Sequence, residues 1–323
     1  DDAPTLAEVK TGTVAENDQA DTTTVTNLTG TLVGADVDVE GLTYGINDGD
    51  GNPVTAVEGT VTLVGTYGTL TLNATTGVYT YTENAAAIEA LDADETDSDS
   101  FTMTVTDGDG ALVTQTYTVN VSGADDAPTL GAVTTGTVAE DDQAATTTVT
   151  NLTGTLAGVD VDVEDLTYGI NDSAGNAVTA AGGTVTLVGT YGTLTLNATT
   201  GVYTYTENAA AIEALDADET DSDSFTMTVT DGDGALVTKT YAVNVSGADD
   251  APTLDEVTTG TVAEDDQADT RTGTNLTGTL VGADVDGDGL TYGINDSAGN
   301  PVTATEGTVT LVGTYGTLTL NAT

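Results

Sequence analysis

Residues 69–82 read TLTLNATTGVYTYT, and this stretch decides the fold class. Threonines alternate with leucines before a Thr-Thr-Gly turn and with tyrosines after it, and such a period of two is typical of half-buried strands. The stretch therefore predicts a β-hairpin with one apolar and one polar face. Only residues 85–91 suggest a helix, of one or two turns. Further strands are predicted at residues 12–14, 42–46, 60–64, 101–105 and 117–121.

The strand pattern belongs to an internal repeat. The string DDAPTL occurs three times at a period of 124 residues, and the first two copies differ at 15 of 124 positions. A period of this length corresponds to a whole domain rather than to one unit of a solenoid. We therefore expect domains at residues 1–124 and 125–248, and a truncated third domain at residues 249–323. About seven short strands in each copy predict an all-β fold of tandem immunoglobulin-like β-sandwiches, arranged as beads on a string.

The composition excludes several classes of function. The 323 residues include 53 acidic and 3 basic ones, for a formal net charge of −50, and no His, Cys or Trp. Without imidazole or thiolate groups, the chain lacks the commonest bases and nucleophiles and the usual ligands of zinc, haem and iron–sulfur clusters. So few cations cannot neutralise a nucleic-acid backbone, which excludes nucleic acid as a partner. No apolar run approaches the length of a membrane span.

The large negative charge has two interpretations. Acidic residues can simply solvate a surface, as in halophilic or disordered proteins. Alternatively, they bind divalent cations, which would cancel their mutual repulsion. The ordered alternation of Val, Thr, Leu and Tyr argues against a disordered chain. Calcium prefers six to eight oxygen ligands, mostly carboxylates and carbonyls, so the supply of acids favours calcium, although a single Asp in a turn is usually only a solvated turn residue.

Four acidic clusters recur within the repeat, and a fifth lies in the linker. In the first copy and its linker, the candidate calcium ligands are Glu16, Asp36, Asp38, Asp92, Asp94, Asp107, Asp125 and Asp126. Their counterparts in the later copies are Glu140, Asp160, Asp162, Asp216, Asp218, Asp231, Asp249, Asp250, Asp284 and Asp286. None is an EF-hand, because the turn Asp107-Gly108-Asp109-Gly110 lacks the bidentate Glu at the twelfth loop position. The segment 47–52, NDGDGN, resembles an EF-hand loop only weakly, because its second copy loses an acid, and its Gly and Asn content indicates a turn.

These segments resemble those of known families. The spaced aspartates at 36–38, the string LDAD at 91–94, the turn at Asp107 and the linker ADDAP at 124–128 are similar to the acidic motifs of cadherins. The closer match is to the VCBS repeat of large bacterial RTX-type adhesins. Its counterparts here are YGTL at 67–70, FTMTVTDGDG at 101–110 and the closing DDAP. The resemblance covers the whole chain, once per period. It implies tandem cadherin-like sandwiches, an extracellular location on the bacterial cell surface, and Ca²⁺ held at domain junctions.

The resemblance also implies a ligand set for the first junction. The set comprises Glu16, Asp92 and Asp94 from the first copy, Asp125 and Asp126 from the linker, and Asp160, Asp162 and Asp231 from the second copy. One position departs from the cadherin pattern, which has an earlier linker aspartate where this chain has Ser122. The pattern therefore predicts one or two ions at each junction rather than three.

The leading hypothesis is a structural or adhesive extracellular module, repeated to form a calcium-rigidified stalk or fibre of a bacterial surface protein. Near-identical copies suit a spacer, because distinct catalytic or recognition tasks would make the copies diverge. An alternative is a subunit of a multi-chain filament, sheath or surface layer, in which Thr- and Val-rich edge strands pair with other copies. The expected partners are the neighbouring repeats and, in the alternative, other copies of the same protein.

Two further classes are less favoured. A carbohydrate-binding module usually exposes aromatic residues, but only 4% of this chain is aromatic, and an ice-binding surface needs the regular face of a solenoid. An enzyme that uses paired carboxylates would need a working pair in every copy without a Trp platform or a deep cleft. No catalytic residues are therefore assigned. The natural termini are expected to lie outside this segment, which starts at a linker-like string and stops within a repeat.

Overall fold

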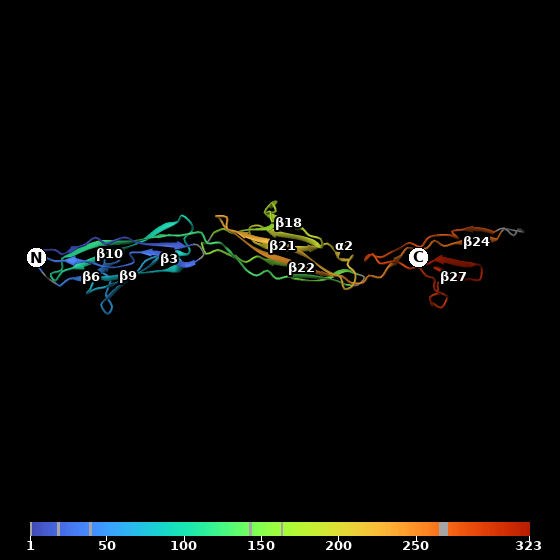
Figure 1. Cartoon of the computed structure of the whole chain (residues 1–323), viewed down its shortest axis with the longest axis horizontal. Helices are drawn as coiled ribbons and strands as arrows, with labels where there is room; N and C mark the ends of the chain where they lie inside the picture. The colour runs from blue at the N-terminus through green and yellow to red at the C-terminus, as the bar shows by residue number, and fades with distance from the viewer. Residues whose placement is uncertain (1, 18–19, 39–40, 142–143, 163, 265–270) are drawn as a thin grey trace. The chain divides into compact units, whose positions relative to one another are not determined.

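The computed structural model describes residues 2–17, 20–38, 41–141, 144–162, 164–264 and 271–323 (Figure 1). These residues form two compact units. Unit 1 spans residues 1–132, 156–169 and 228–239, and unit 2 spans residues 133–155, 170–227 and 240–323. Unit 1 therefore contains the first copy of the repeat together with two segments of the second copy.

The first copy folds into a five-stranded and a four-stranded sheet. Its elements are β1 (Thr5–Leu6), β2 (Gly12–Asn17), β3 (Ala20–Thr26), β4 (Thr29–Thr31), β5 (Gly34–Ala35), β6 (Thr43–Asn47), β7 (Thr60–Val64), β8 (Gly68–Asn73), β9 (Val78–Glu83), α1 (Ala85–Ile88), β10 (Thr96–Thr106) and β11 (Leu112–Ser122). The sheet orders are β3-β2-β11-β10-β6 and β4-β9-β8-β7, and β1 pairs only with β5. Strands β2 and β11 are parallel, and the other neighbouring strands within these two sheets are antiparallel. The predicted all-β, immunoglobulin-like sandwich is confirmed.

The second copy repeats this topology. Its elements are β12 (Thr129–Leu130), β13 (Gly136–Asp141), β14 (Ala144–Thr150), β15 (Thr153–Thr155), β16 (Gly158–Val159), β17 (Thr167–Asn171), β18 (Thr184–Val188), β19 (Gly192–Asn197), β20 (Val202–Glu207), α2 (Ala209–Ile212), β21 (Thr220–Thr230) and β22 (Leu236–Ser246). The sheet orders are β14-β13-β22-β21-β17 and β15-β20-β19-β18. Because the sequences are nearly identical, each strand has the same neighbours as its counterpart in the first copy.

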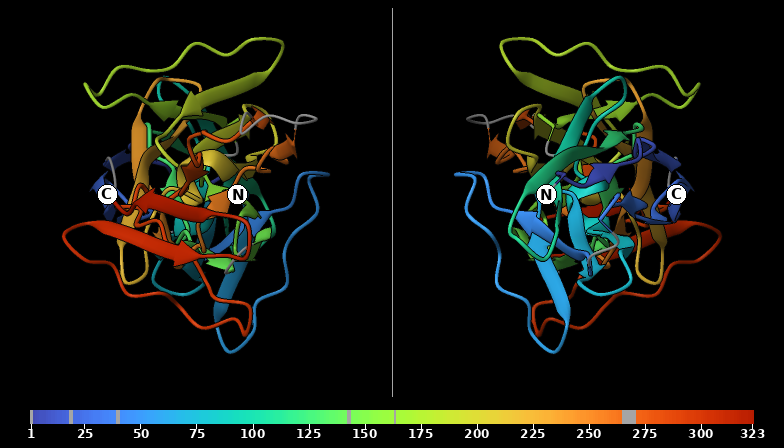
Figure 2. Two further views of the ribbon diagram at one scale, coloured as in Figure 1. Left: turned by 90° about the vertical axis from the view of Figure 1, so that its right-hand side faces the viewer. Right: turned by 90° about the vertical axis from the view of Figure 1, so that its left-hand side faces the viewer.

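The third copy forms two-stranded sheets. Its strands are β23 (Thr253–Leu254), β24 (Thr261–Glu264), β25 (Arg271–Thr274), β26 (Gly282–Ala283), β27 (Thr308–Val312) and β28 (Thr317–Asn321). The antiparallel pair β27–β28 is drawn as red arrows in Figure 2. The described residues contain no counterparts of β9, β10 and β11 here, so Tyr315 is 97% exposed, whereas the matching Tyr67 is 8% exposed.

Alternate residues of the strands build the core. In β8 and β9, Leu70, Leu72, Tyr79 and Tyr81 are buried, while the threonines between them are more exposed. The rings of Tyr79 and Tyr117 pack across the sandwich with their centroids 5.1 Å apart. Burial of large aromatic side chains contributes strongly to stability. The apolar residues of the alternating sequence pattern are therefore the residues that form the core.

One core contact joins the sheets through a buried carboxylate. Asp99 on β10 is 5% exposed. It accepts hydrogen bonds from the backbone N–H of Thr66 (2.8 Å) and of Tyr67 (3.0 Å) and from the hydroxyl of Tyr81 (2.7 Å). These donors satisfy the buried charge. Asp223 makes the same contacts in the second copy, so this link between the sheets is part of the repeated fold.

The predicted helix is a single turn, α1, whose Ile88 is buried. The predicted strands are present. Strands β6 and β7 have the expected length, whereas β10 and β11 are longer, at 11 residues each. Among the described residues, no helix has the length and apolar character needed to cross a bilayer.

Candidate metal site

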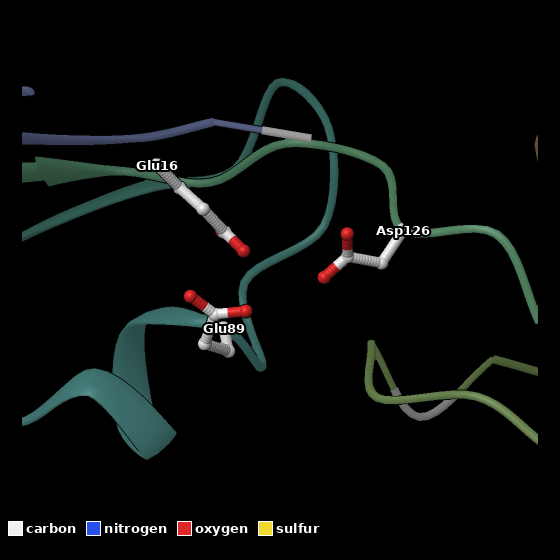
Figure 3. A group of neighbouring side chains, drawn as sticks. All are labelled: Glu16, Glu89 and Asp126. Atoms are coloured by element: carbon white, nitrogen blue, oxygen red, sulfur yellow. The ribbon is translucent and has the colours of Figure 1, made fainter. Parts of the chain in front are cut away.

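Three carboxylates of unit 1 converge where the first copy meets the linker. Glu16 lies on β2, Glu89 caps the C-terminal end of α1, and Asp126 belongs to the linker. Each offers an oxygen within 4.8 Å of the others. Figure 3 shows the three side chains pointing toward one another. Glu16 and Asp126 are only 7% and 6% exposed, so this is a partly buried concentration of negative charge.

A second group lies in the same unit and is centred on Asp125. Its carboxylate shares one cluster with Asp92 and Asp233 and another with Glu164 and Asp231, again with oxygens within 4.8 Å of one another. Asp92 comes from the first copy, Asp125 from the linker, and the other three from loops of the second copy. Three separate segments of the chain thus contribute carboxylates to one region.

One oxygen of each of several acids is used to hold the loops in place. Glu16 accepts a hydrogen bond from the backbone N–H of Ala124 (3.2 Å), and Asp162 accepts one from Asp126 (2.7 Å). Asp160 in turn accepts one from the N–H of Asp162 (2.9 Å). These bonds fix the linker backbone between β2 and the loop that follows β16.

Asp231 plays the same role in the turn between β21 and β22. Its Oδ1 accepts hydrogen bonds from the N–H groups of Gly234 (2.7 Å) and Ala235 (2.8 Å). This arrangement is typical of Asp in turns. The side chain is only 6% exposed, so the turn directs it into the protein and not toward solvent.

The second oxygen of each of these acids has no donor. Among the described residues, buried carboxylate oxygens without a hydrogen-bond partner include Glu16 Oε1, Asp160 Oδ2, Asp162 Oδ1 and Asp231 Oδ2. Buried polar atoms are nearly always paired, and an ionised carboxylate without a partner is costly. The arrangement therefore has the character of a cation site whose oxygen ligands are already oriented.

Burial and like charge raise the pKa of the acids Glu16 and Asp162. Burial raises the pKa of Glu16 to about 7, assisted by the charges of Glu89, Asp126 and Asp162 and opposed by the hydrogen bond from Ala124. Burial likewise raises the pKa of Asp162 to about 6, and neighbouring carboxylates add to the shift. A positive ion would reverse both effects, because an opposite charge favours the ionised form.

Gly123 brings the linker close to the acidic segment of the first copy. A Cβ atom at this position would lie 2.0 Å from the carbonyl oxygen of Leu91. The N–H of Gly123 donates to the carbonyl of Glu95 (3.1 Å). Only glycine allows this approach, and it places Asp125 next to Asp92.

Unit 2 contains a corresponding set. Glu140, Glu213 and Asp250 form one cluster, and Asp216, Asp249 and Asp286 form another. The supporting hydrogen bonds recur, from Ala248 N–H to Glu140 (3.1 Å) and from Asp250 N–H to Asp286 (2.8 Å). Burial also raises the pKa of Glu140. The arrangement is therefore a property of the repeat.

The predicted ligands fall into three classes. Those within the clusters are Glu16, Asp92, Asp125, Asp126, Asp231, Glu140, Asp216, Asp249, Asp250 and Asp286. Asp162 and Asp284 are hydrogen-bonded directly to cluster residues, and Asp160 is bonded to Asp162. Those outside every cluster of the described chain are Asp36, Asp38, Asp94, Asp107 and Asp218. Asp94 and Asp218 are exposed and have positive φ angles of 64° and 67°.

The clusters include four acids that the sequence analysis did not assign as ligands: Glu89, Glu164, Glu213 and Asp233. Glu89 reaches the site from the end of a helix of a single turn, which is a tertiary placement without a local motif. Asp233 is the counterpart of Asp109, whose position in an Asp-Gly-Asp-Gly turn was the available signal.

The donor set fits a hard divalent cation. All the clustered side chains are carboxylates, and the chain has only three basic residues, Lys10, Lys239 and Arg271, that could neutralise them. Calcium takes such oxygen ligands in flexible geometry, whereas magnesium demands a tighter octahedron and retains its waters. The spread of ligands over three segments suits calcium.

Comparison with solved structures gives weak likenesses to cadherin repeats. Human CDH23 EC21–23 has a TM-score of 0.37 and 15% identity, over 99% of this chain and 98% of that one. Mouse cadherin-23 EC22–24 has a TM-score of 0.34 and 14% identity, over 77% and 68%. Protocadherin gamma B2 domains 3–6 have a TM-score of 0.31 and 17% identity, over 77% and 53%. No curated protein matches the chain.

The sequence match to a family is decisive. The model of the bacterial cadherin-like domain matches residues 1–123 and again residues 125–247. Cadherin-like domains are extracellular adhesive or structural repeat modules, not catalytic ones, and typically bind calcium at the linkers between domains. The chain belongs to the bacterial cadherin-like domain family.

Proposed function

We propose that this chain is an extracellular structural or adhesive module of a bacterial surface protein, in which Ca²⁺ rigidifies the junctions between consecutive repeats. In this module the repeats are residues 1–124, 125–248 and 249–323, and we assign the chain no catalytic role. The observation that carries the proposal is the set of clustered carboxylates that also have a buried oxygen without a hydrogen-bond donor in the described chain, such as Glu16 and Asp231.

At the first junction, the proposed ligands come from the two clusters of unit 1. Glu16, Glu89 and Asp126 form one position, and Asp92, Asp125, Glu164, Asp231 and Asp233 surround the other. Asp160 and Asp162 lie beside both as further oxygen donors. A bound Ca²⁺ would supply positive charge and six to eight coordination positions. Two positions agree with the one or two ions expected from the sequence.

The residues explain how such a junction would respond to calcium. Without a cation, the carboxylates of Glu16 and Asp162 repel their neighbours, and hydrogen bonds such as that from Ala124 N–H to Glu16 oppose this repulsion. With their charge neutralised, the same side chains tie the first copy, the linker and the second copy together. The loss of repulsion and of hinge freedom stiffens the junction.

Extracellular calcium concentrations suit this design. Extracellular modules bind calcium with dissociation constants of about 10⁻⁴ to 10⁻³ M. Ligand at about 100 times its dissociation constant stabilises the folded state by about 2.7 kcal/mol per site. Such sites fill outside the cell and empty in a calcium-poor compartment, so the module would become rigid only after secretion.

The experiment compares matched aspartates by calorimetric calcium titration of the full chain. Asp231→Asn alters a junction acid, and Asp107→Asn alters its counterpart in the first copy, which holds the same kind of turn through bonds to Gly110 and Ala111. We expect D231N to remove or weaken by at least tenfold one calcium-binding event, and D107N to bind like the parent. Equal titrations of D231N, D107N and the parent would refute the proposed ligand set.

A further inference from the structure

Strand β18 forms one edge of the four-stranded sheet of the second copy, next to β19. The N–H of Gly189 donates to the carbonyl of Gly192 (2.7 Å). In an antiparallel pair, alternate residues turn their backbone groups toward the partner strand. The odd-numbered residues of β18 therefore face β19, and the N–H and C=O groups of Thr186 and Val188 point away from the sheet.

The first outward-facing residue of β18 has backbone hydrogen bonds, whereas the later ones are open to another strand. Thr184 exchanges two hydrogen bonds with Ala181, of 2.8 and 3.2 Å, across a tight turn. In the described part of the chain, no backbone hydrogen bond reaches the outward groups of Thr186 and Val188. An edge of this kind is a template for another strand.

The edge also lacks the usual protection against pairing. Natural edges carry Lys, Pro or a bulge, but β18 reads TVTLV and pairs with β19 in regular register. Val188 is 72% exposed. The counterparts Val64 and Val312 are 72% and 76% exposed, so each copy presents an apolar side chain at this position.

The charge distribution identifies a second copy of the chain as the occupant. A formal net charge of −50 keeps two chains apart. Residues 173–206, which include β18, β19 and most of β20, contain no charged residue. In the other copies, Glu58 and Glu306 stand two residues before the edge strand, but the second copy has Gly182. Two copies meet with least repulsion at β18.

We propose that the chain associates with a second copy through antiparallel pairing of β18 with β18, centred on Leu187. This register pairs Thr186 with Val188 of the second copy and the reverse, which uses all four open N–H and all four open C=O groups in the two-fold pair as four hydrogen bonds. It also covers both exposed Val188 side chains. The pairing goes beyond the proposed junction function and needs no calcium.

The first test is sedimentation equilibrium of the full chain with EGTA, at about 1 M ionic strength, where the Debye length is about 3 Å. Val188→Glu places a charge at the edge. The matched control, Val202→Glu, places the same charge on β20, an inner strand, at a side chain that is 50% exposed. We expect concentration-dependent dimers of the parent and of V202E, and at least tenfold weaker dimers of V188E. Gly182→Glu, which restores the residue of the other copies, is expected to weaken dimers less than V188E.

A second test reads the register directly, because the chain has no cysteine. Leu187→Cys places two thiols on the two-fold axis, and we expect a disulfide-linked dimer on mild oxidation. Val202→Cys is expected to associate like the parent but to form no disulfide-linked dimer. A parent that stays monomeric, equal dimerisation of V188E and V202E, or equal cross-linking of the two cysteine variants would overturn the proposal. Because calcium is absent throughout, these outcomes are independent of the junction sites.

Discussion

Two aspartates of the repeat occupy different environments in the first and second copies. At the start of the first copy, Asp2 and Asp38 are exposed, whereas their counterparts Asp126 and Asp162 are 6% and 8% exposed. The local geometry does not differ, since Asp2 N–H donates to Asp38 at 2.8 Å and Asp126 N–H donates to Asp162 at 2.7 Å. The sequence of the repeat thus determines the conformation of this loop in both copies.

The difference comes from what precedes each loop. Before Asp126 the chain supplies Glu16, Glu89 and Asp92, which bury the acids and crowd them with like charge. The starting face of the first copy has no such neighbours among the described residues. Among the described residues, Asp126 therefore belongs to a carboxylate cluster, whereas its counterpart Asp2 does not.

The largest expected effect is that of calcium removal on the whole chain. Chelation should lower the free energy of unfolding by about 2.7 kcal/mol for each ion that was held at 100 times its dissociation constant, and it should lower the melting temperature accordingly. Thermal unfolding with calcium, with EGTA and with magnesium in place of calcium measures this. Identical melting curves in the three buffers would contradict the account.

The effect of one substitution on the free energy of unfolding is expected to change sign when calcium is removed, and the matched substitution in the first copy should show no such change. Asp160 and Asp36 each accept a hydrogen bond from the N–H two residues later, at 2.9 and 2.7 Å. Asp160→Asn should destabilise the chain by about 1–3 kcal/mol in calcium, because a buried charged ligand is lost, and should stabilise it in EGTA, because crowding of like charges is relieved. Asp36→Asn should show no reversal between the two buffers when urea unfolding is measured.

The smallest expected effect is a pH dependence of the calcium-free chain. The pKa of Glu16 is raised from 4.5 in the unfolded state to about 7 in the folded state. Its folded form therefore binds the proton more tightly, and its contribution to stability is complete below pH 4.5 and is lost as the pH rises to about 7. In unfolding experiments with EGTA, Glu16→Gln should remove this loss, and a pH profile unchanged from the parent would contradict the assignment.

The apparent calcium affinity should depend on pH in the opposite direction from the stability of the calcium-free chain. Protons compete with the ion for Glu16 and for Asp162, whose pKa is raised to about 6. The apparent affinity should therefore weaken as the pH falls below about 7.

Much of the fold could be predicted from sequence because its signal is local. Alternation in residues 69–82 gave β8 and β9, and the exact repetition of residues 59–114 made the second sandwich certain once the first was known. Short strands such as β4 and β5 were not predicted, because two or three residues carry no period. The buried Asp99 was not predicted either, since its donors lie 18 to 33 residues away.

The candidate site was predicted only in part, because some of its residues lie in local motifs and others are brought together by the tertiary structure. Paired acids in turns and in the linker are visible as motifs, and Asp125, Asp126 and Asp231 lie in the clusters. Glu89 and Glu164 were not found, because only the tertiary structure brings them to the linker. Asp94 was included for its sequence motif, but its backbone conformation leaves the side chain exposed.

The most direct test is a crystal structure of the full chain grown with calcium. The account predicts anomalous density for an ion between the carboxylates of Glu16, Glu89 and Asp126, and for a second ion beside Asp125. Water molecules alone at both positions, with the carboxylates at hydrogen-bonding distance from them, would contradict it.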